Sequence, residues 1–309
     1  MQALLDAIAT LAPLDDTAEA QRLFHGRGGR FPGCEHLALD AFPPVLLLTS
    51  FKPLDEAALT VVGAALAARG VLNWVYQCRG EGAVTRLMAG AVPEPHVVTE
   101  AGTRYLVHLL RGQNHGLFLD MAAGRRWVRE HIRPGAKVLN LFAYSCAFSV
   151  VALQAGAAEV VNVDMASGAL ATGRSNHELN GVKAGAKFLA HDIFNSWGKL
   201  TRGGPYDLVI CDPPSFQKGS FVATKDYARL ARRLPALLAP GGHALLCLNA
   251  PELGEAFLHN VVAAHAPELQ FIGRVANPAA FDDVSPDRSL KVLAYRLCGH
   301  DSLLGWAQG

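Results

Sequence analysis

The 309 residues are enough for two domains, each with a hydrophobic core of its own. Half of the residues are hydrophobic and 18% are charged, a composition that fits a compact globular protein. The formal net charge of +1 excludes an overall electrostatic field that drives nucleic-acid binding, so any basic contact surface must be local.

The six cysteines are scattered without a Cys-x-x-Cys pair, which is typical of reduced thiols and argues against a disulfide framework or a zinc site. The first residues lack the basic segment of a signal peptide, and no apolar run reaches the roughly 18 residues of a membrane span. We therefore expect a soluble, cytoplasmic chain with neither a metal nor a membrane partner. The pattern leaves the oligomeric state open.

Residues 1–112 are predicted to form a small α+β domain. Two short helices are expected within residues 1–24, with a cap at Asp15-Asp16-Thr17 between them. The glycine-rich loop 25–33 lacks the Lys-Ser/Thr of a phosphate cradle, so we interpret it as a turn that presents Arg27 and Arg30 to solvent, with ligand contact as the alternative. One helix near 54–69 and six strands complete the domain, the strands lying near 36–40, 45–49, 71–78, 84–90, 96–99 and 104–109.

Residues 113–309 are predicted to form a second domain in which strands and helices alternate. Helix 121–133 carries four arginines, which form either a solvated face or a phosphate-contacting patch. The predicted strands are 136–142, 159–163, 186–190, 206–211, 242–248, 269–275 and 290–297, and the predicted helices between them are 146–155, 166–180, 193–200, 224–238 and 251–265. No helix separates the last two strands, so one of them must run antiparallel. The pattern predicts a Rossmann-like α/β sheet of seven strands with one reversed edge strand.

The turn after strand 136–142 contains no glycine from Asn140 to Phe148. A dinucleotide pyrophosphate needs glycines there, so that the backbone can approach the phosphates. Asp164 lies 24 residues after Asn140, close to the spacing at which a carboxylate binds the ribose hydroxyls of a nucleoside cofactor. S-adenosylmethionine (SAM) has a ribose but no phosphate, so the pattern favours SAM over NAD. The alternative is that Asp164 merely ends a strand.

Two further strands end on carboxylates. Asp192 follows strand 186–190, where it can accept a hydrogen bond from the adenine amino group while Ile193 and Phe194 pack on the ring. It can equally be the N-cap of the next helix, and one role does not exclude the other. Asp212 follows strand 206–211 and opens the segment Asp212-Pro-Pro-Ser-Phe216.

The two prolines make this segment rigid and remove its N–H donors, so it presents only carbonyls and a carboxylate. Such a loop suits the exocyclic amine of a nucleic-acid base, on which Phe216 can stack. The alternative is a plain strand stop. Asn249 ends strand 242–248 at the same crevice, where it orients the substrate or caps the following helix. Cys247 lies within an apolar run and is expected to be a packed, inert thiol.

In order, these segments resemble the class I SAM-dependent methyltransferases, and more narrowly the bacterial large-subunit ribosomal RNA methyltransferases. The resembling segments are Gly116–Asp120 with Arg125, Asn140–Ser145, Val163-Asp164, Asn180-Gly181, Asp192, Asp212–Phe216 and Asp287–Lys291. The resemblance implies SAM as the cofactor and RNA, namely 23S rRNA, as the partner. It implies cofactor binding by Phe118, Asn140, Phe142, Tyr144, Ser145, Asp164, Met165, Asp192, Ile193 and Asp212. It implies catalytic roles for Asp212, Pro213, Pro214, Phe216 and Asn249.

The sequence departs from this family at three points. The RNA-binding PUA domain that many members carry first has no counterpart here, Cys146 replaces the usual glycine of the cofactor turn, and Asn249 stands where the cytosine C5 branch has Ser-Cys-Ser. The asparagine resembles the branch that methylates guanine nitrogens. Two other functions stay open: a SAM-dependent methyltransferase for a protein or small molecule, and a SAM-binding module or nucleotide-dependent oxidoreductase without transferase activity.

Overall fold

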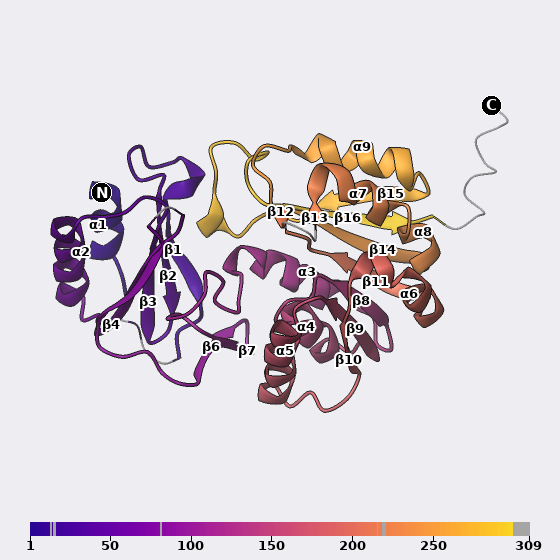
Figure 1. Cartoon of the computed structure of the whole chain (residues 1–309), viewed down its shortest axis with the longest axis horizontal. Helices are drawn as coiled ribbons and strands as arrows, with labels where there is room; N and C mark the ends of the chain where they lie inside the picture. The colour runs from indigo at the N-terminus through magenta and orange to yellow at the C-terminus, as the bar shows by residue number, and fades with distance from the viewer. Residues whose placement is uncertain (13, 15–16, 81, 215, 218–220, 299–309) are drawn as a thin grey trace. The chain divides into compact units, whose positions relative to one another are not determined.

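The computed structural model describes residues 1–298 except 13, 15–16, 81, 215 and 218–220. The chain divides into two compact units (Figure 1). Unit 1 contains Met1–Ala122 together with Asn277–Pro286, and unit 2 contains Ala123–Ala276 and the chain from Asp287 onward. The sequence interpretation divided the chain at residue 112 and gave all later residues to the second domain. The structure instead assigns the segment Asn277–Pro286, which we call the strap, to unit 1.

Contacts with residues 22–30 of unit 1 explain why the strap belongs there. The Arg30 Nε–Asp282 Oδ2 distance is 2.8 Å, and the Arg22 guanidinium lies 4.5 Å from the centre of the Phe281 ring. The backbone N–H of Val284 donates to the carbonyl of Gly28 at 2.9 Å. These contacts join residues more than 250 positions apart, which no local sequence pattern can reveal.

Unit 1 is built on a five-stranded sheet, within the described residues, in the order β1-β2-β3-β4-β5. Its strands are β1 (Gln21–His25), β2 (Leu37–Phe42), β3 (Val45–Ser50), β4 (Asn73–Cys78) and β5 (Val84–Ala89), and its helices are α1 (Gln2–Ala9) and α2 (Glu56–Ala68). A separate hairpin consists of β6 (His96–Glu100) and β7 (Thr103–Val107).

The second helix expected within residues 1–24 is wrong, because residues 21–25 form β1. This strand pairs antiparallel with β2, with Phe24 opposite Leu39, and Phe24 is buried in the core of unit 1. Pairing with β2 therefore determines the conformation of residues 21–25, a segment too short to show a clear helical or strand periodicity. Asp15 and Asp16 of the expected cap lie outside the described residues.

Unit 2 is built on a seven-stranded sheet, within the described residues, in the order β10-β9-β8-β11-β14-β16-β15. Its strands are β8 (Lys137–Leu141), β9 (Glu159–Asp164), β10 (Ala186–Ala190), β11 (Tyr206–Cys211), β14 (Leu238–Leu248), β15 (Leu269–Arg274) and β16 (Lys291–Leu297). The first five in this order pair in parallel, and β16 runs antiparallel to both β14 and β15.

The prediction that one of the last two strands runs antiparallel is confirmed by β16, the last strand, but the expected position of that strand at the edge of the sheet is wrong. β16 lies between β14 and β15, because its residues Leu293 to Tyr295 are buried on both faces, at 0–2% exposure. The edge strand is β15, whose Phe271 and Ile272 are 41% and 44% exposed. The segments β15 and β16 have similar apolar content, but β16 is the more deeply buried of the two.

Helices cover both faces of this sheet (Figure 1). The helices of unit 2 are α3 (Ala122–His131), α4 (Ala147–Gln154), α5 (Ser167–Leu179), α6 (Trp197–Gly203), α7 (Ala223–Ala231), α8 (Leu234–Leu237) and α9 (Glu255–His265). Alternate strand residues such as Leu139, Val161 and Val209 form one core with α6, α7, α8 and α9. The residues between them, such as Asn140 and Asn162, face α4, whose Ser149 accepts a hydrogen bond from Asn162.

Two predicted helices and one predicted helix surface differ from those in the structure. The helix expected over 224–238 is divided into α7 and α8, and β14 begins directly after α8. The helix expected over 193–200 is a 3-10 turn at Ile193–Asn195 followed by α6. The arginines of α3 do not form one solvated face, because Arg125 is only 3% exposed.

Candidate cofactor and acceptor site

The candidate site lies at the carboxyl ends of the parallel strands of unit 2. β8 lies between β9 and β11 in the sheet and pairs in parallel with both. Asp164, the last residue of β9, and Asp212, directly after β11, therefore flank the same strand at the same edge. In α/β sheets of this kind, ligands bind in the crevice at these strand ends.

The carboxylate of Asp164 is fixed by two backbone N–H groups. The N–H of Tyr144 donates to Oδ2 and the N–H of Ala166 donates to Oδ1, each at 2.8 Å. Asp164 is half-buried. A carboxylate has about four acceptor positions, so capacity remains for the two hydroxyls of a ribose. The side chain thus both ties the turn after β8 to the end of β9 and offers acceptors to a ligand.

The turn after β8 has a left-handed backbone at alternate positions although it contains no glycine. The φ angles are 58° at Phe142, 47° at Tyr144 and 58° at Cys146. Each such residue costs on the order of 1–2 kcal/mol relative to glycine, and such strain gathers at functional sites. Side chains therefore stand where a dinucleotide turn has none, which suits a phosphate-free nucleoside such as SAM better than a pyrophosphate.

Helix α5 holds this strained turn in place. Asn176 is 0% exposed and its Nδ2 donates to the carbonyl of Ser145 at 2.9 Å. Cys146 packs against Gly173, where an added Cβ would lie 2.5 Å from the Cys146 sulfur. Burial raises the pKa of the Cys146 thiol, which therefore stays protonated. The sequence interpretation missed Asn176, although the helical spacing of Leu170, Gly173 and Asn176 could have indicated a buried stripe.

Asn140 belongs to a buried chain of hydrogen bonds beneath the turn. Asn140 Nδ2 donates to Asn162 Oδ1 at 2.9 Å, and Asn162 Nδ2 donates to Ser149 Oγ at 3.0 Å. Burial lowers the pKa of His177, so its neutral Nε2 accepts from Ser149 at 2.9 Å while Nδ1 donates to the carbonyl of Gly173 at 2.6 Å. Asn140 is 1% exposed, so we infer that its amide supports β8 and β9 instead of facing solvent.

The residues predicted for the adenine side lie after β10. Asp192 is the N-cap of the 3-10 turn, accepting from the N–H of Phe194 at 2.9 Å and from Asn195 Nδ2 at 2.6 Å. Ile193 is 3% exposed and Phe194 is half-buried, with the Arg229 guanidinium 3.9 Å from its ring centre. The capping role of Asp192 is therefore present, and it fixes the carboxylate at the strand end.

The residues predicted for the acceptor side follow β11 and β14. Asp212 and Pro214 are half-buried and Pro213 is buried. Phe216 lies in the short strand β12 (Phe216–Gln217), but its side chain lies outside the described part of the structure. Asn249 is exposed directly after β14, and it does not cap α9, which begins at Glu255 with Gly254 as its N-cap. Cys247 is buried at 0% exposure, as predicted.

An aromatic group that the sequence interpretation missed lies between the two sides. Phe221, in β13 (Phe221–Val222), is 1% exposed, and its ring centre lies 5.4 Å from Phe142 and 6.4 Å from Phe194. Tyr227 contacts Phe221 at 5.8 Å and donates a hydrogen bond to the carbonyl of Cys247. No motif marks Phe221, because its partners come from separate strand ends.

Two predicted cofactor residues are exposed. Met165 follows Asp164 in unit 2 and is 55% exposed, whereas Phe118 lies in unit 1 and is 41% exposed. Among the described residues, no group of three or more His, Cys, Asp or Glu side chains could hold a metal ion. A search of the same residues finds no helix with the length and apolarity that crossing a membrane requires.

Comparison with known proteins identifies the class to which this fold and site belong. Residues 21–296 match the family described as S-adenosylmethionine-dependent methyltransferase, so the chain belongs to that family and SAM is its cofactor. The Aeromonas salmonicida protein named ribosomal RNA large subunit methyltransferase I is 36% identical over 191 residues, which are 59% of this chain and 47% of that protein. The protein of the same name from Erwinia tasmaniensis is 31% identical over 282 residues, covering 84% of this chain and 69% of that protein.

A solved structure, described as a methyltransferase complexed with SAH, resembles the chain with a TM-score of 0.82 and 25% identity, covering 92% of this chain and 76% of the other. SAH is the product that remains when SAM loses its methyl group. The chain thus spans about half the length of the Aeromonas relative and more of the others. The comparisons assign the fold and the cofactor.

Proposed function

We propose that this protein transfers a methyl group from SAM to RNA, at a base nitrogen of 23S rRNA. The observation that carries the proposal is the position of Asp164 and Asp212 on either side of β8, one beside a turn suited to a nucleoside and the other followed by two prolines that offer no N–H donor. The names of the ribosomal RNA methyltransferases to which the chain is similar support RNA as the acceptor. This substrate places the reaction in the cytoplasm.

SAM supplies a methyl group already activated on a sulfonium, so the protein has mainly to position the reactants. In the proposal, the fixed carboxylate of Asp164 accepts hydrogen bonds from the ribose hydroxyls. The adenine is bound by Asp192, Ile193 and Phe194. The turn beside it is formed by Phe142, Tyr144 and Ser145. Phe118 and Met165 remain proposed cofactor contacts. Orientation of this kind supplies several kcal/mol of the barrier reduction in transfer reactions.

On the acceptor side, the carboxylate of Asp212 and the carbonyl of Pro213 accept hydrogen bonds from the amine that is methylated. The Pro213-Pro214 pair keeps both acceptors fixed, because two prolines restrict the backbone. Phe216 stacks on the base and Asn249 orients it. Unit 1 is proposed to recognise the surrounding RNA.

The test uses the purified full chain with methyl-labelled SAM, offered in parallel to total RNA and to total protein from a strain that lacks the gene. We expect label in RNA, and nucleoside mass spectrometry of the rRNA identifies the methylated base. Asp212→Ala should abolish this label while calorimetric SAM binding persists. Label only in protein, or SAM binding without transfer to either pool, would overturn the proposal.

A further inference from the structure

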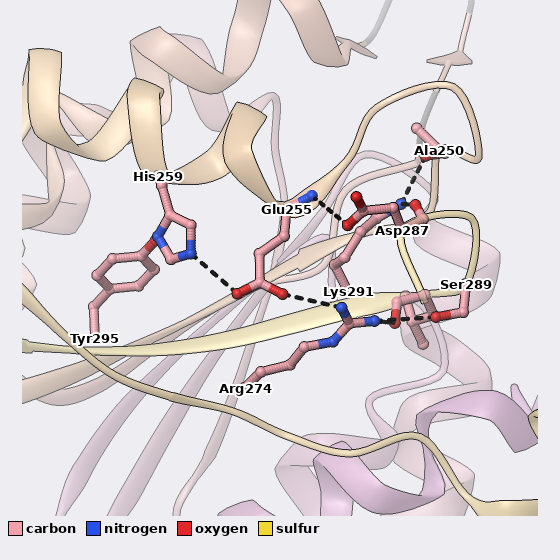
Figure 2. A network of polar contacts seen from close by, with 9 residues as sticks. Ala250, Glu255, His259, Arg274, Asp287, Ser289, Lys291 and Tyr295 are labelled. Atoms are coloured by element: carbon pink, nitrogen blue, oxygen red, sulfur yellow. Dashed lines mark hydrogen bonds and ion pairs between the residues drawn. The ribbon is translucent and has the colours of Figure 1, made fainter. Parts of the chain in front are cut away.

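Lys291, the first residue of β16, has a side chain fully removed from solvent, at 0% exposure. Its Nζ donates to two backbone carbonyls, that of Ala250 at 2.8 Å and that of Asp287 at 2.7 Å (Figure 2). Burial of an ammonium group carries a large desolvation cost that these hydrogen bonds offset only in part. A methionine would fill similar space without that cost, so packing alone does not account for a lysine here.

The first of these carbonyls belongs to the loop that carries Asn249. Leu248, the last residue of β14, lies opposite Lys291 in the antiparallel register, so the ammonium reaches just past the end of β14. Ala250 is 1% exposed, and its carbonyl also accepts from the N–H of Leu253 at 3.1 Å. Lys291 therefore fixes the point at which the chain leaves the sheet, directly after the exposed Asn249.

The second carbonyl belongs to Asp287, whose carboxylate fixes the other end of the same loop. Asp287 Oδ1 accepts from the N–H of Glu255, the first residue of α9, at 3.2 Å. A Cβ on Gly254 would lie 3.1 Å from Asp287 Oδ2, so the Asp287 carboxylate packs closely against the backbone of Gly254. Glu255 is held further by Arg274 and His259, each at 3.0 Å (Figure 2). Lys291 and Asp287 thus anchor the loop 249–254 at its two ends.

We propose that Lys291 is a positioning residue for the methyl acceptor: it sets the place of Asn249 without touching the substrate. This inference rests on the proposed acceptor role of Asn249. A lysine suits the task because both groups to be held are carbonyls, which only accept, and because its long side chain reaches them from the neighbouring strand. The cofactor turn after β8 has its own anchors in Asp164 and Asn176, so SAM binding should not depend on Lys291.

The decisive variant is Lys291→Met, with Tyr295→Phe as its matched control. Tyr295 is 2% exposed on the same strand, and its hydroxyl lies 2.9 Å from His259 Nδ1, so the control also removes a partly buried hydrogen bond from β16. We expect Lys291→Met to lower kcat/KM for RNA by about tenfold to a hundredfold, because misplacing a reactant by an ångström has effects of that size. SAM affinity should stay at the wild-type value, and Tyr295→Phe should keep wild-type transfer.

Hydrogen exchange measured by mass spectrometry separates this inference from the proposed function. In Lys291→Met, peptides over 249–255 should exchange faster while those over 140–148 do not change. If the wild-type protein does not methylate RNA, the proposed function fails, and unchanged exchange in 249–255 would still overturn the positioning role.

With wild-type activity intact, equal transfer by Lys291→Met and Tyr295→Phe also overturns the inference. If Lys291→Met does not fold, Lys291→Gln carries the same test, since its shorter amide cannot hold both carbonyls. Lys291→Gln should lose transfer and keep SAM affinity, and wild-type kinetics in that variant refute the role.

Discussion

Replacing Asp164 by asparagine tests whether one carboxylate both anchors the cofactor turn and binds the ribose. The two oxygens accept from the N–H groups of Tyr144 and Ala166, each at 2.8 Å. Asparagine has one carbonyl oxygen and one NH2 group, so its side chain can accept a hydrogen bond from only one of these N–H groups. The other N–H group then faces the NH2, which is itself a donor and cannot accept. The substitution therefore removes at least one hydrogen bond to a charged acceptor without changing the size of the side chain.

Hydrogen bonds to charged groups contribute about 1.5–3 kcal/mol each. The turn should therefore lose that much stability, which for a unit of this size corresponds to a fall in Tm of roughly 3–10 °C. The ribose loses at least one bond of the same kind, so SAM affinity should fall roughly ten- to a hundredfold. The left-handed residues of the turn add to the effect, because their strain is no longer opposed by the bond to Tyr144.

Isothermal calorimetry with SAM and thermal unfolding measure the two effects separately. Asp207→Asn is the matched control, because Asp207 Oδ2 accepts from the N–H of Lys137 at 2.8 Å at the opposite ends of the strands. Asparagine can still accept this single bond, so Asp207→Asn should lower Tm less than Asp164→Asn does, and it should leave SAM affinity unchanged. Wild-type SAM affinity in Asp164→Asn, or an equal loss in Asp207→Asn, would refute the reasoning.

Three further outcomes are expected. Asp212→Ala should retain SAM binding by calorimetry and lose methyl transfer, and parallel loss of both would contradict the assignment of Asp212 to the acceptor side. Gly173→Ala should destabilise unit 2 by about 1–3 kcal/mol in urea unfolding, because the new methyl group meets the Cys146 sulfur, and Cys146→Gly should recover most of that loss. Burial, with Arg22 and Arg27 nearby, lowers the pKa of His25 from 6.5 to about 4, so the unfolded chain takes up this proton more readily. The resulting stabilisation of unit 1 is complete above about pH 6.5 and is lost as the pH falls toward 4. The free energy of unfolding of His25→Gln should therefore depend less on pH over this window. Identical dependence of the unfolding free energy on pH in wild type and variant would rule the effect out.

The positions of the strands of unit 2, and the residues at their carboxyl ends, could be predicted from the sequence. Strands such as 206–211 are apolar runs that end at a polar or proline-containing segment, and this local signal is independent of the rest of the fold. The sequence alone therefore assigns Asp164 and Asp212 to strand ends at one edge of the sheet. Their contacts with SAM and acceptor remain predictions.

Features that depend on distant contacts could not be predicted. The position of β16 inside the sheet follows from burial against β14 and β15, and the strap follows from contacts with residues 22–30. The cofactor role that the family resemblance implies for Asn140 stays a prediction, whereas its hydrogen bond to Asn162 on the neighbouring strand β9 could not be predicted. Asn176, Phe221 and Lys291 act through neighbours that only the folded chain brings together.

The strap also determines how the protein can be dissected. The backbone passes between the two units after Ala122, again after Ala276 and a third time after Pro286. A fragment that stops near residue 122 lacks the Phe281 and Asp282 partners of Arg22 and Arg30, and the complementary fragment carries those residues without a surface to pack on. Exchanging unit 1 between relatives therefore requires grafting both of its pieces together.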